Sequence, residues 1–186
     1  PQKKRSDRYN IYIDGKFVFA TDAEGLITAK LKIGKVLEDQ TLAILKIKEE
    51  QNKLINSTLN FLSFRPRSQK EIEDYLAKKI SKNQKIKFAQ AKSDPKIVQV
   101  MKKLSKYNYV NDKEFAKWWI TSRITHAKGK RLIMAELLAK GIKKDLVEKA
   151  LQNIPGQVDL AQKAVEKKLP RWVNLPHIER KKKLYA

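Results

Sequence analysis

The chain has 186 residues, of which 41% are hydrophobic, and this is enough for one or two small domains with a buried core. It contains no cysteine, which excludes disulfides, thiol catalysis and metal binding by cysteine. The net charge of +22 predicts attraction to polyanions, nucleic acid first, although a lysine-rich composition alone would also spread such charge over any surface.

The sequence also predicts where the protein acts. No run of about 18 apolar residues is present, so no membrane-spanning helix is expected. The absence of cysteine favours a reducing compartment, and the prediction is a cytoplasmic protein.

The first elements are predicted to be a β-hairpin and a short helix. Two alternating apolar runs within residues 9–21 flank Asp14 and Gly15, a pair favoured in type I′ turns. Asp22 is expected to cap a helix over residues 23–32, and Gly34 to follow its end.

Helices are predicted for the next seventy residues of the chain. Apolar residues recur at helical spacing over residues 40–64, and Pro66 breaks the run. Ser68 and Glu71 then form a capping box that starts the second helix. The basic segment 80–92 has no clear pattern, and Asp94, followed by a proline, starts the third helix.

The remaining helices follow the same signals. Asp112 is expected to cap a helix over residues 113–127, and Gly129 separates it from a helix that Gly141 ends at the C′ position. The sequence then predicts a helix stopped by Pro155 and Gly156, a helix over residues 157–168 ended by Pro170, and a last helix from near Pro176.

An internal repeat with an offset of 62 residues relates the two halves of this helical region. The offset pairs Leu54 with Ala116, Thr58 with Ile120, Leu62 with Ile124 and Ile72 with Met134. Chance similarity of amphipathic helices is the alternative, but the shared order of helix, basic break, capped helix and third helix favours a repeat. The prediction is a mainly α protein in which tandem three-helix repeats form an elongated array after a small N-terminal β-hairpin.

The predicted domains follow from this repeat: residues 1–38, 39–111, 112–156 and 157–186. The third repeat stops within its second helix, so either the native protein is expected to continue past Ala186 or a disordered tail is missing here.

Two adjacent tryptophans are predicted to have different roles. On a helical wheel Trp119 joins Ala116 and Ile120 on the apolar side, so it should help to close the core. Trp118 falls on the other side, either exposed as an anchor for a partner or packed against the neighbouring repeat. Arg123 lies near the apolar side and is expected to pair with a carboxylate such as that of Glu136.

No catalytic or metal-binding pattern is present. His126 and His177 do not have metal-ligand spacing, and the glycines form no phosphate-binding loop. The protein is therefore expected not to be an enzyme and to need no cofactor or metal.

Several segments resemble the RecX family, whose members regulate the RecA recombinase filament. They are FRPRS (64–68) with Glu71-Ile72 and Tyr75-Leu76, YVND (109–112) with Phe115-Ala116 and Arg123, ELLAKGI (136–142) after Gly129 and Ile133, and Glu179-Arg180 with Lys183-Leu184. The resemblance covers most of residues 9–186. The long basic segment 80–92 and the incomplete third repeat depart from the family pattern.

The resemblance implies tandem three-helix repeats that lie along the groove of the RecA–DNA filament. Such a protein would limit ATPase, strand exchange and coprotease activities in DNA repair, without catalysis and as a monomer. DNA, single- or double-stranded, is a further expected partner, and the alternative is a stand-alone basic helical-repeat protein that binds DNA.

The predicted partner-binding residues lie mainly at the basic breaks of the repeats, and the same edge of each repeat is expected to face the filament. For the basic residues of both breaks, capping of a helix C-terminus through its dipole is the alternative. The candidates are Arg65, Arg67, Trp118, Lys128, Lys130, Arg131, Lys140 and Arg171.

Overall fold

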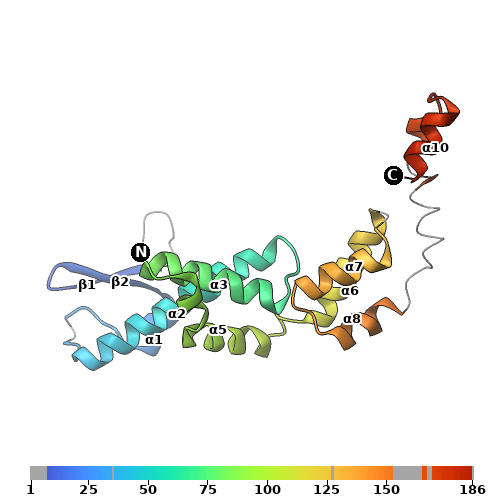
Figure 1. Cartoon of the computed structure of the whole chain (residues 1–186). Coiled ribbons are helices and arrows are strands. Elements are labelled where there is room, and N and C mark those ends of the chain that lie inside the picture. Colours follow the sequence, from blue (N-terminus) through green and yellow to red (C-terminus); the bar gives the residue numbers. More distant parts are fainter. Residues whose placement is uncertain (1–7, 35, 127, 153–164, 167–168, 186) are drawn as a thin grey trace.

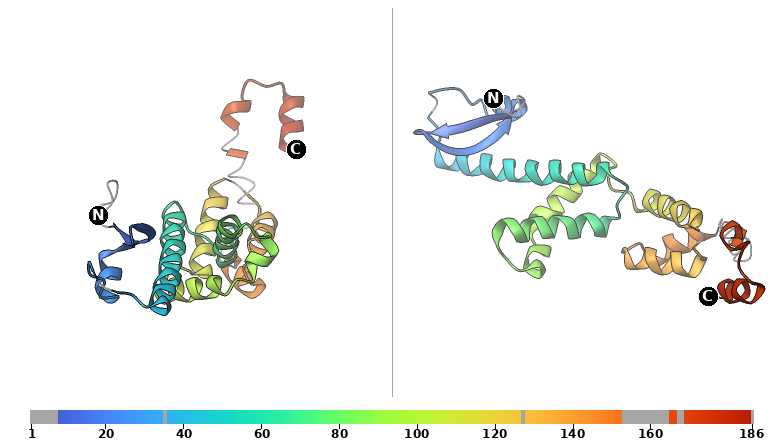
Figure 2. Two further views of the ribbon diagram at one scale, coloured as in Figure 1. Left: turned by 90° about the vertical axis from the view of Figure 1, so that its left-hand side faces the viewer. Right: turned by 90° about the horizontal axis from the view of Figure 1, so that it is seen from above.

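The computed structural model describes residues 8–34, 36–126, 128–152, 165–166 and 169–185. These residues form an elongated, mainly helical array with a two-stranded hairpin at its N-terminal end (Figures 1 and 2). The predicted fold class is confirmed, because the helices that follow the hairpin gather into two successive bundles, each with its own core. The exact domain boundaries remain a prediction.

The hairpin pairs β1 (Arg8–Ile13) with β2 (Lys16–Asp22) in antiparallel register. Asp14 and Gly15 both have positive φ, 49° and 74°, as the predicted type I′ turn requires. Asp22 caps α1 (Ala23–Thr28), and its Oδ1 accepts a hydrogen bond of 2.8 Å from the Gly25 amide. This helix ends earlier than predicted because Lys30 adopts a left-handed conformation with φ 48°.

The hairpin is held against the first long helix by a buried charge pair. The Arg8 guanidinium pairs with the carboxylate of Glu49, whose side chain is only 5% exposed. Arg8 Nη2 also donates to the Ala20 carbonyl at 2.9 Å, so one side chain links the two strands to the helix. A two-stranded hairpin is marginal alone and needs such a neighbour. Figure 2 shows the hairpin beside the N-terminal part of this helix.

The first repeat contains α2 (Asp39–Ser63), α3 (Gln69–Gln84), α4 (Phe88–Lys92) and α5 (Pro95–Lys106). The capping box at Ser68 and Glu71 and the Asp94 cap are confirmed. The segment 80–92, which the sequence left open, holds the end of α3 and the short α4. The core consists of residues from all four helices: Leu54, Ile72, Leu76, Ala77, Ile80, Ala91, Ile97, Val100, Met101 and Leu104.

The second repeat contains α6 (Asp112–Thr125), α7 (Lys130–Ala139) and α8 (Lys144–Leu151). Its separate core consists of Phe115, Ala116, Trp119, Ile120, Ile133, Leu137, Ile142, Val147 and Leu151. Gly141 follows the C-cap residue of α7 with φ +83°, as predicted for the C′ position.

The repeat register differs from the prediction in the second helix. Ser68 and Gly129 occupy the N-cap positions of α3 and α7, and the fully buried Ile72 and Ile133 follow at the same distance. Ile72 therefore matches Ile133 and not Met134. The cause is the break between the first two helices, which is one residue shorter in the second repeat.

The last described segments lie beyond the two repeats, where α10 (His177–Tyr185) forms the end of the array (Figure 1). The predicted helix after Pro176 is confirmed. Residues 169–172 are helical, so Pro170 lies within a helix instead of ending one. The helix predicted over 157–168 falls almost entirely outside the described residues. Within the described chain, no helix combines the length and the apolarity that crossing a membrane requires.

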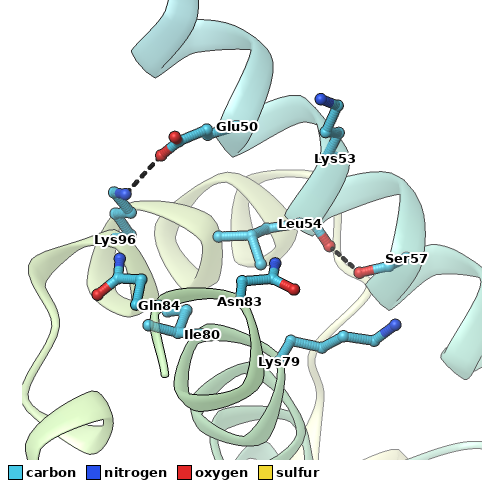
Figure 3. Close-up of a pocket in the computed structure, with 9 residues that line it drawn as sticks. All are labelled: Glu50, Lys53, Leu54, Ser57, Lys79, Ile80, Asn83, Gln84 and Lys96. Carbon is cyan, nitrogen blue, oxygen red and sulfur yellow. Dashed lines mark hydrogen bonds and ion pairs between the residues drawn. The ribbon is translucent and has the colours of Figure 1, made fainter. Parts of the chain in front are cut away.

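The first repeat also encloses a cleft of about 390 Å³ between α2, α3 and α5. Figure 3 shows that its lining side chains come from all three helices. None of the predicted site residues lines this cleft.

Candidate partner interface at the junction of the two repeats

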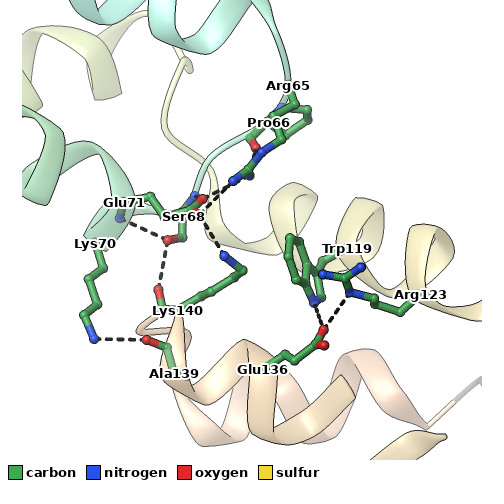
Figure 4. A network of polar contacts seen from close by, with 10 residues as sticks. All are labelled: Arg65, Pro66, Ser68, Lys70, Glu71, Trp119, Arg123, Glu136, Ala139 and Lys140. Carbon is green, nitrogen blue, oxygen red and sulfur yellow. Dashed lines mark hydrogen bonds and ion pairs between the residues drawn. The ribbon is translucent and has the colours of Figure 1, made fainter. Parts of the chain in front are cut away.

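The two repeats meet where the first turn of α3 lies against the C-terminal end of α7 (Figure 4). Ser68 Oγ donates to the Lys140 carbonyl at 2.8 Å, and Lys70 Nζ donates to the Ala139 carbonyl at 3.0 Å. The last carbonyls of a helix have no partner within the helix. The first repeat therefore supplies hydrogen bonds that α7 cannot make for itself.

Glu71 is the centre of this junction. Its carboxylate accepts two hydrogen bonds from Arg65, at 2.9 and 3.1 Å, and one from Lys140 Nζ at 2.8 Å. Burial tends to raise the pKa of Glu71, but the hydrogen bonds from Arg65 and then Lys140 outweigh it and lower the pKa to about 2. The carboxylate thus stays ionised and holds cations from both repeats.

The two tryptophans complete the junction from the second repeat. The Arg65 guanidinium lies 5.6 Å from the Trp118 ring centroid and 5.9 Å from that of Trp119. Both distances are within cation–π range. Trp118 is half-buried and makes the predicted contact between repeats through Arg65, while its predicted role as an anchor for a partner stays a prediction. The prediction that Trp119 belongs to the core is confirmed, because its side chain is 8% exposed.

A second carboxylate orders the indole of Trp119. Glu136 Oε2 accepts from Trp119 Nε1 at 2.8 Å and from Arg123 Nε at 2.7 Å. The Arg123 guanidinium also lies 4.1 Å from the Trp119 ring centroid. The predicted pair of Arg123 and Glu136 is confirmed. Lys140 Nζ, at the C-terminal end of α7 in the same repeat, lies 4.2 Å from the centroid of the Trp119 ring.

The predicted role of Asp112 as an N-cap is wrong. Asn111 caps α6 instead, because its Oδ1 accepts from the amides of Lys113 and Glu114 at 3.1 and 3.2 Å. Asp112 Oδ1 is thereby left to accept from the Gln69 amide of the first repeat at 2.8 Å. Burial raises the pKa of Asp112, with a smaller contribution from the charge of Glu73, against the lowering effect of the Gln69 bond.

Gly141 allows the closest backbone approach in the junction. A Cβ at this position would lie 2.8 Å from both Cβ and Cδ of Lys70, and its φ of +83° already disfavours other residues. A glycine is thus required here both by conformation and by the proximity of the other repeat.

The structure separates the predicted site residues into groups. Arg65, Trp118 and Lys140 belong to the junction, and Arg67 stacks on Phe61 at 3.9 Å beside it. Burial, and then the charge of Arg65, lower the pKa of Arg67.

The other candidates are exposed. Lys128, Lys130 and Arg131 lie where α6 ends and α7 begins, at the other end of these helices from the junction, and Arg171 follows α8, the last helix of the second repeat. The two basic breaks therefore have different environments. That of the first repeat is occupied by contacts inside the protein, and that of the second is open to a partner.

Sequence reasoning missed the central role of Glu71 and the contributions of Lys70 and Asp112. The capping box predicted a role for Glu71 at the start of its helix, but no contact with the second repeat. The contacts at the junction can fix the orientation of the two repeats relative to each other. They also place cationic side chains beside the junction.

Three family models match the chain. Their descriptions are "Regulatory protein RecX N-terminal domain" for residues 1–38, "RecX, first three-helix domain" for residues 55–81 and "RecX, second three-helix domain" for residues 111–151. The two matched three-helix domains fall within the two repeats described above.

Curated relatives agree with these matches. The chain is 39% identical over 173 residues to "Regulatory protein RecX" of Bacillus subtilis (strain 168), a match that covers 91% of this chain and 61% of the relative. It is 36% identical over 160 residues to the protein of the same name in Listeria monocytogenes serovar 1/2a, covering 86% and 55%. The chain thus spans little more than half of the length of these relatives.

Solved structures show the same fold. A crystal structure of regulatory protein RecX superimposes with a TM-score of 0.66 and 28% identity, covering 98% of this chain and 86% of that one. RecX from Lactobacillus salivarius gives a TM-score of 0.53 and 26% identity, covering 74% and 84%. With the family models and the curated relatives, these similarities show that the chain belongs to the RecX family of regulatory proteins.

Proposed function

We propose that this protein is a non-catalytic regulator of the RecA recombinase that binds along the RecA–DNA filament and limits its ATPase, strand-exchange and coprotease activities. Membership of the RecX family supports an association with RecA regulation. The proposal places the protein in the cytoplasm, where it acts as a monomer.

The observation that carries the proposal is the junction of the two repeats. Hydrogen bonds from Ser68, Lys70 and Lys140 cross the boundary between α3 and α7, so the repeats form one elongated unit. An elongated unit of tandem repeats offers a long surface that suits an extended partner such as a filament.

The exposed cations at the break of the second repeat are the proposed contact with the filament. Lys128, Lys130 and Arg131 have no carboxylate within 4.0 Å among the described residues. Arg131 can bind a carboxylate or phosphate through two hydrogen bonds. A regulator can shift a filament between states only if it binds one state more tightly than the other.

A titration of the DNA-dependent ATPase of RecA tests the proposal. The wild-type chain should inhibit, and Lys130→Glu with Arg131→Glu should raise the half-inhibitory concentration by at least about tenfold, because like charges across an interface repel. Lys102→Glu with Lys106→Glu on α5 is a control with the same change in net charge and should stay near wild type. Absence of inhibition by the wild-type chain would refute the function, and equal inhibition by all three proteins would refute the proposed surface.

The net charge of +22 favours a second candidate, a stand-alone DNA-binding protein. Such a protein would bind DNA with a steep dependence on salt and without any recombinase. Measuring DNA affinity at two salt concentrations beside the ATPase titration separates the two functions.

A further inference from the structure

The boundary between the two repeats is polar, although each repeat has an apolar core of its own. In the described part of the chain the two cores have no residue in common. The contacts that cross the boundary run from Arg65 and the first turn of α3 to α6 and to the C-terminal end of α7 (Figure 4). Two folded units move relative to each other unless a large apolar interface joins them. The geometry therefore allows the repeats to turn against each other without disturbing either core.

The connector between α5 and α6 has two parts that belong to different repeats. Asn108 has a positive φ of 58°, and the amide of Tyr109 donates to the Leu104 carbonyl at 3.0 Å, so these residues close the end of α5. Val110 packs against the core of the first repeat. Asn111, the next residue, caps α6 in the second repeat. The backbone between Val110 and Asn111 is thus the point about which the two repeats can turn.

The bonds that hold the repeats in their present orientation can break without opening a core. Lys70 is exposed, and its ammonium binds a carbonyl at the end of α7. Ser68 Oγ also accepts from the Glu71 amide at 3.2 Å, so α3 keeps its cap when the bond to the Lys140 carbonyl is lost. The closed junction holds Arg65 and Lys140 on one carboxylate, and the repulsion between these two cations opposes closure.

We propose that Val110 and Asn111 form a hinge, and that the bonds of Ser68, Lys70 and Glu71 with the end of α7 form its latch. With the latch closed, the array has the arrangement of Figure 1. With the latch open, the second repeat turns as a rigid body, because a few residues between elements can absorb the change in backbone angles. The array then bends, and its surface changes curvature without unfolding of either repeat. The hinge is a property of the protein alone and does not rest on the proposed action on RecA.

The test measures a distance between the two repeats in the full chain, without recombinase. The chain has no cysteine, so Lys82→Cys on α3 and Lys149→Cys on α8 can carry two nitroxide labels at exposed positions. Pulsed electron spin resonance gives the distribution of the distance between the labels, which should be narrow in the otherwise unchanged chain. Lys70→Glu with Lys140→Glu places negative charge against the end of α7 and against Glu71, so the width of the distribution should at least about double.

Two further variants accompany this latch variant. Lys46→Glu with Lys53→Glu on α2 changes the net charge equally at two exposed positions, and its distribution should stay as narrow as that of the unchanged labelled chain. A thermal melt shows whether the latch variant folds. If it does not fold, Lys70→Ala with Lys140→Ala replaces it and should widen the distribution by at least about half, because two bonds of the latch are lost.

Hydrogen exchange distinguishes a hinge from local unfolding. The amides of both cores should keep their protection in the latch variant, because the repeats turn without opening. A wider distribution with loss of protection in the second core would overturn the hinge, since the repeat would then unfold instead of turning. An unchanged width in the latch variant, or equal widening in the control variant, would overturn the latch. Failure of RecA inhibition with the distance results as expected would refute only the proposed regulatory function.

Discussion

Lys140, the C-cap residue of α7, donates a 2.8 Å hydrogen bond to the carboxylate of Glu71 in the first turn of α3. The same carboxylate binds Arg65 through two hydrogen bonds, and Arg65 lies over the tryptophans of α6. One acidic side chain thus joins three elements from two repeats. Its loss would leave two cations beside each other with no counter-charge.

Replacement of Glu71 by glutamine should destabilise the protein. The expected loss is about 1–3 kcal/mol, because partly buried hydrogen bonds to charged groups are removed and their partners are left unsatisfied. Urea unfolding measures the change. Glu114→Gln removes an exposed pair with Lys117 and serves as the control, with an expected loss below about 1 kcal/mol. Equal losses in the two variants would contradict a special role of Glu71.

The junction should also weaken in acid. The pKa of Glu71 is about 2 in the folded protein, below its ordinary value of 4.5, so the folded state binds fewer protons than the unfolded state. Its contribution to stability is complete above pH 4.5 and should be lost as the pH falls toward 2. The measurement is the difference in free energy of unfolding between wild type and Glu71→Gln across this range.

That difference should shrink as the pH falls, because glutamine carries no titrating charge. Asp112, whose raised pKa acts in the opposite sense, is present in both proteins and cancels. A difference that is independent of pH would show that the charge of Glu71 does not matter.

Replacement of Gly141 by alanine should loosen the contact between repeats. The new Cβ would meet Lys70 at 2.8 Å, and the positive φ adds conformational strain of about 1 kcal/mol or more. Gly34→Ala is the matched control, since Gly34 has a φ of +78° and no neighbour within 4 Å of a Cβ. Thermal unfolding should show a larger loss for Gly141→Ala, and equal losses would mean that Lys70 moves aside without cost.

The adjacent tryptophans should respond differently to truncation. Trp119→Ala should cost about 3–5 kcal/mol, because it empties a large volume in the core of the second repeat and leaves Glu136 without one donor. Trp118→Ala should cost about 1–2 kcal/mol, because it removes a half-buried ring packed at the edge of the core and the cation–π contact with Arg65. Denaturant unfolding distinguishes the two, and a loss for Trp118 as large as that for Trp119 would contradict this assignment.

Local sequence signals predicted much of the helical architecture, because their causes lie within a few residues. The capping box joins Ser68 to Glu71, and the Asp94 cap binds the amide of Lys96. The pair of Arg123 and Glu136 was also predictable, since helical periodicity places both near the face that the adjoining helices α6 and α7 share.

The junction could not be predicted in the same way. Lys140 and Glu71 are 69 residues apart in sequence, and the Gln69 amide and Asp112 are 43 apart. Such contacts depend on how the two repeats meet, which a helical pattern does not specify. The choice between Asn111 and Asp112 as N-cap was equally ambiguous, since both residue types cap well. In the structure Asn111 accepts from the Lys113 amide, whereas Asp112 accepts from the Gln69 amide of the other repeat.

The most direct test of the central claim is co-sedimentation of the wild-type chain with preassembled RecA–DNA filaments, compared with the same DNA alone at equal salt. Saturable binding to the filament, tighter than binding to the bare DNA, is the predicted result. The account would be contradicted if the chain did not bind the filament, or if it bound the filament no more tightly than the bare DNA.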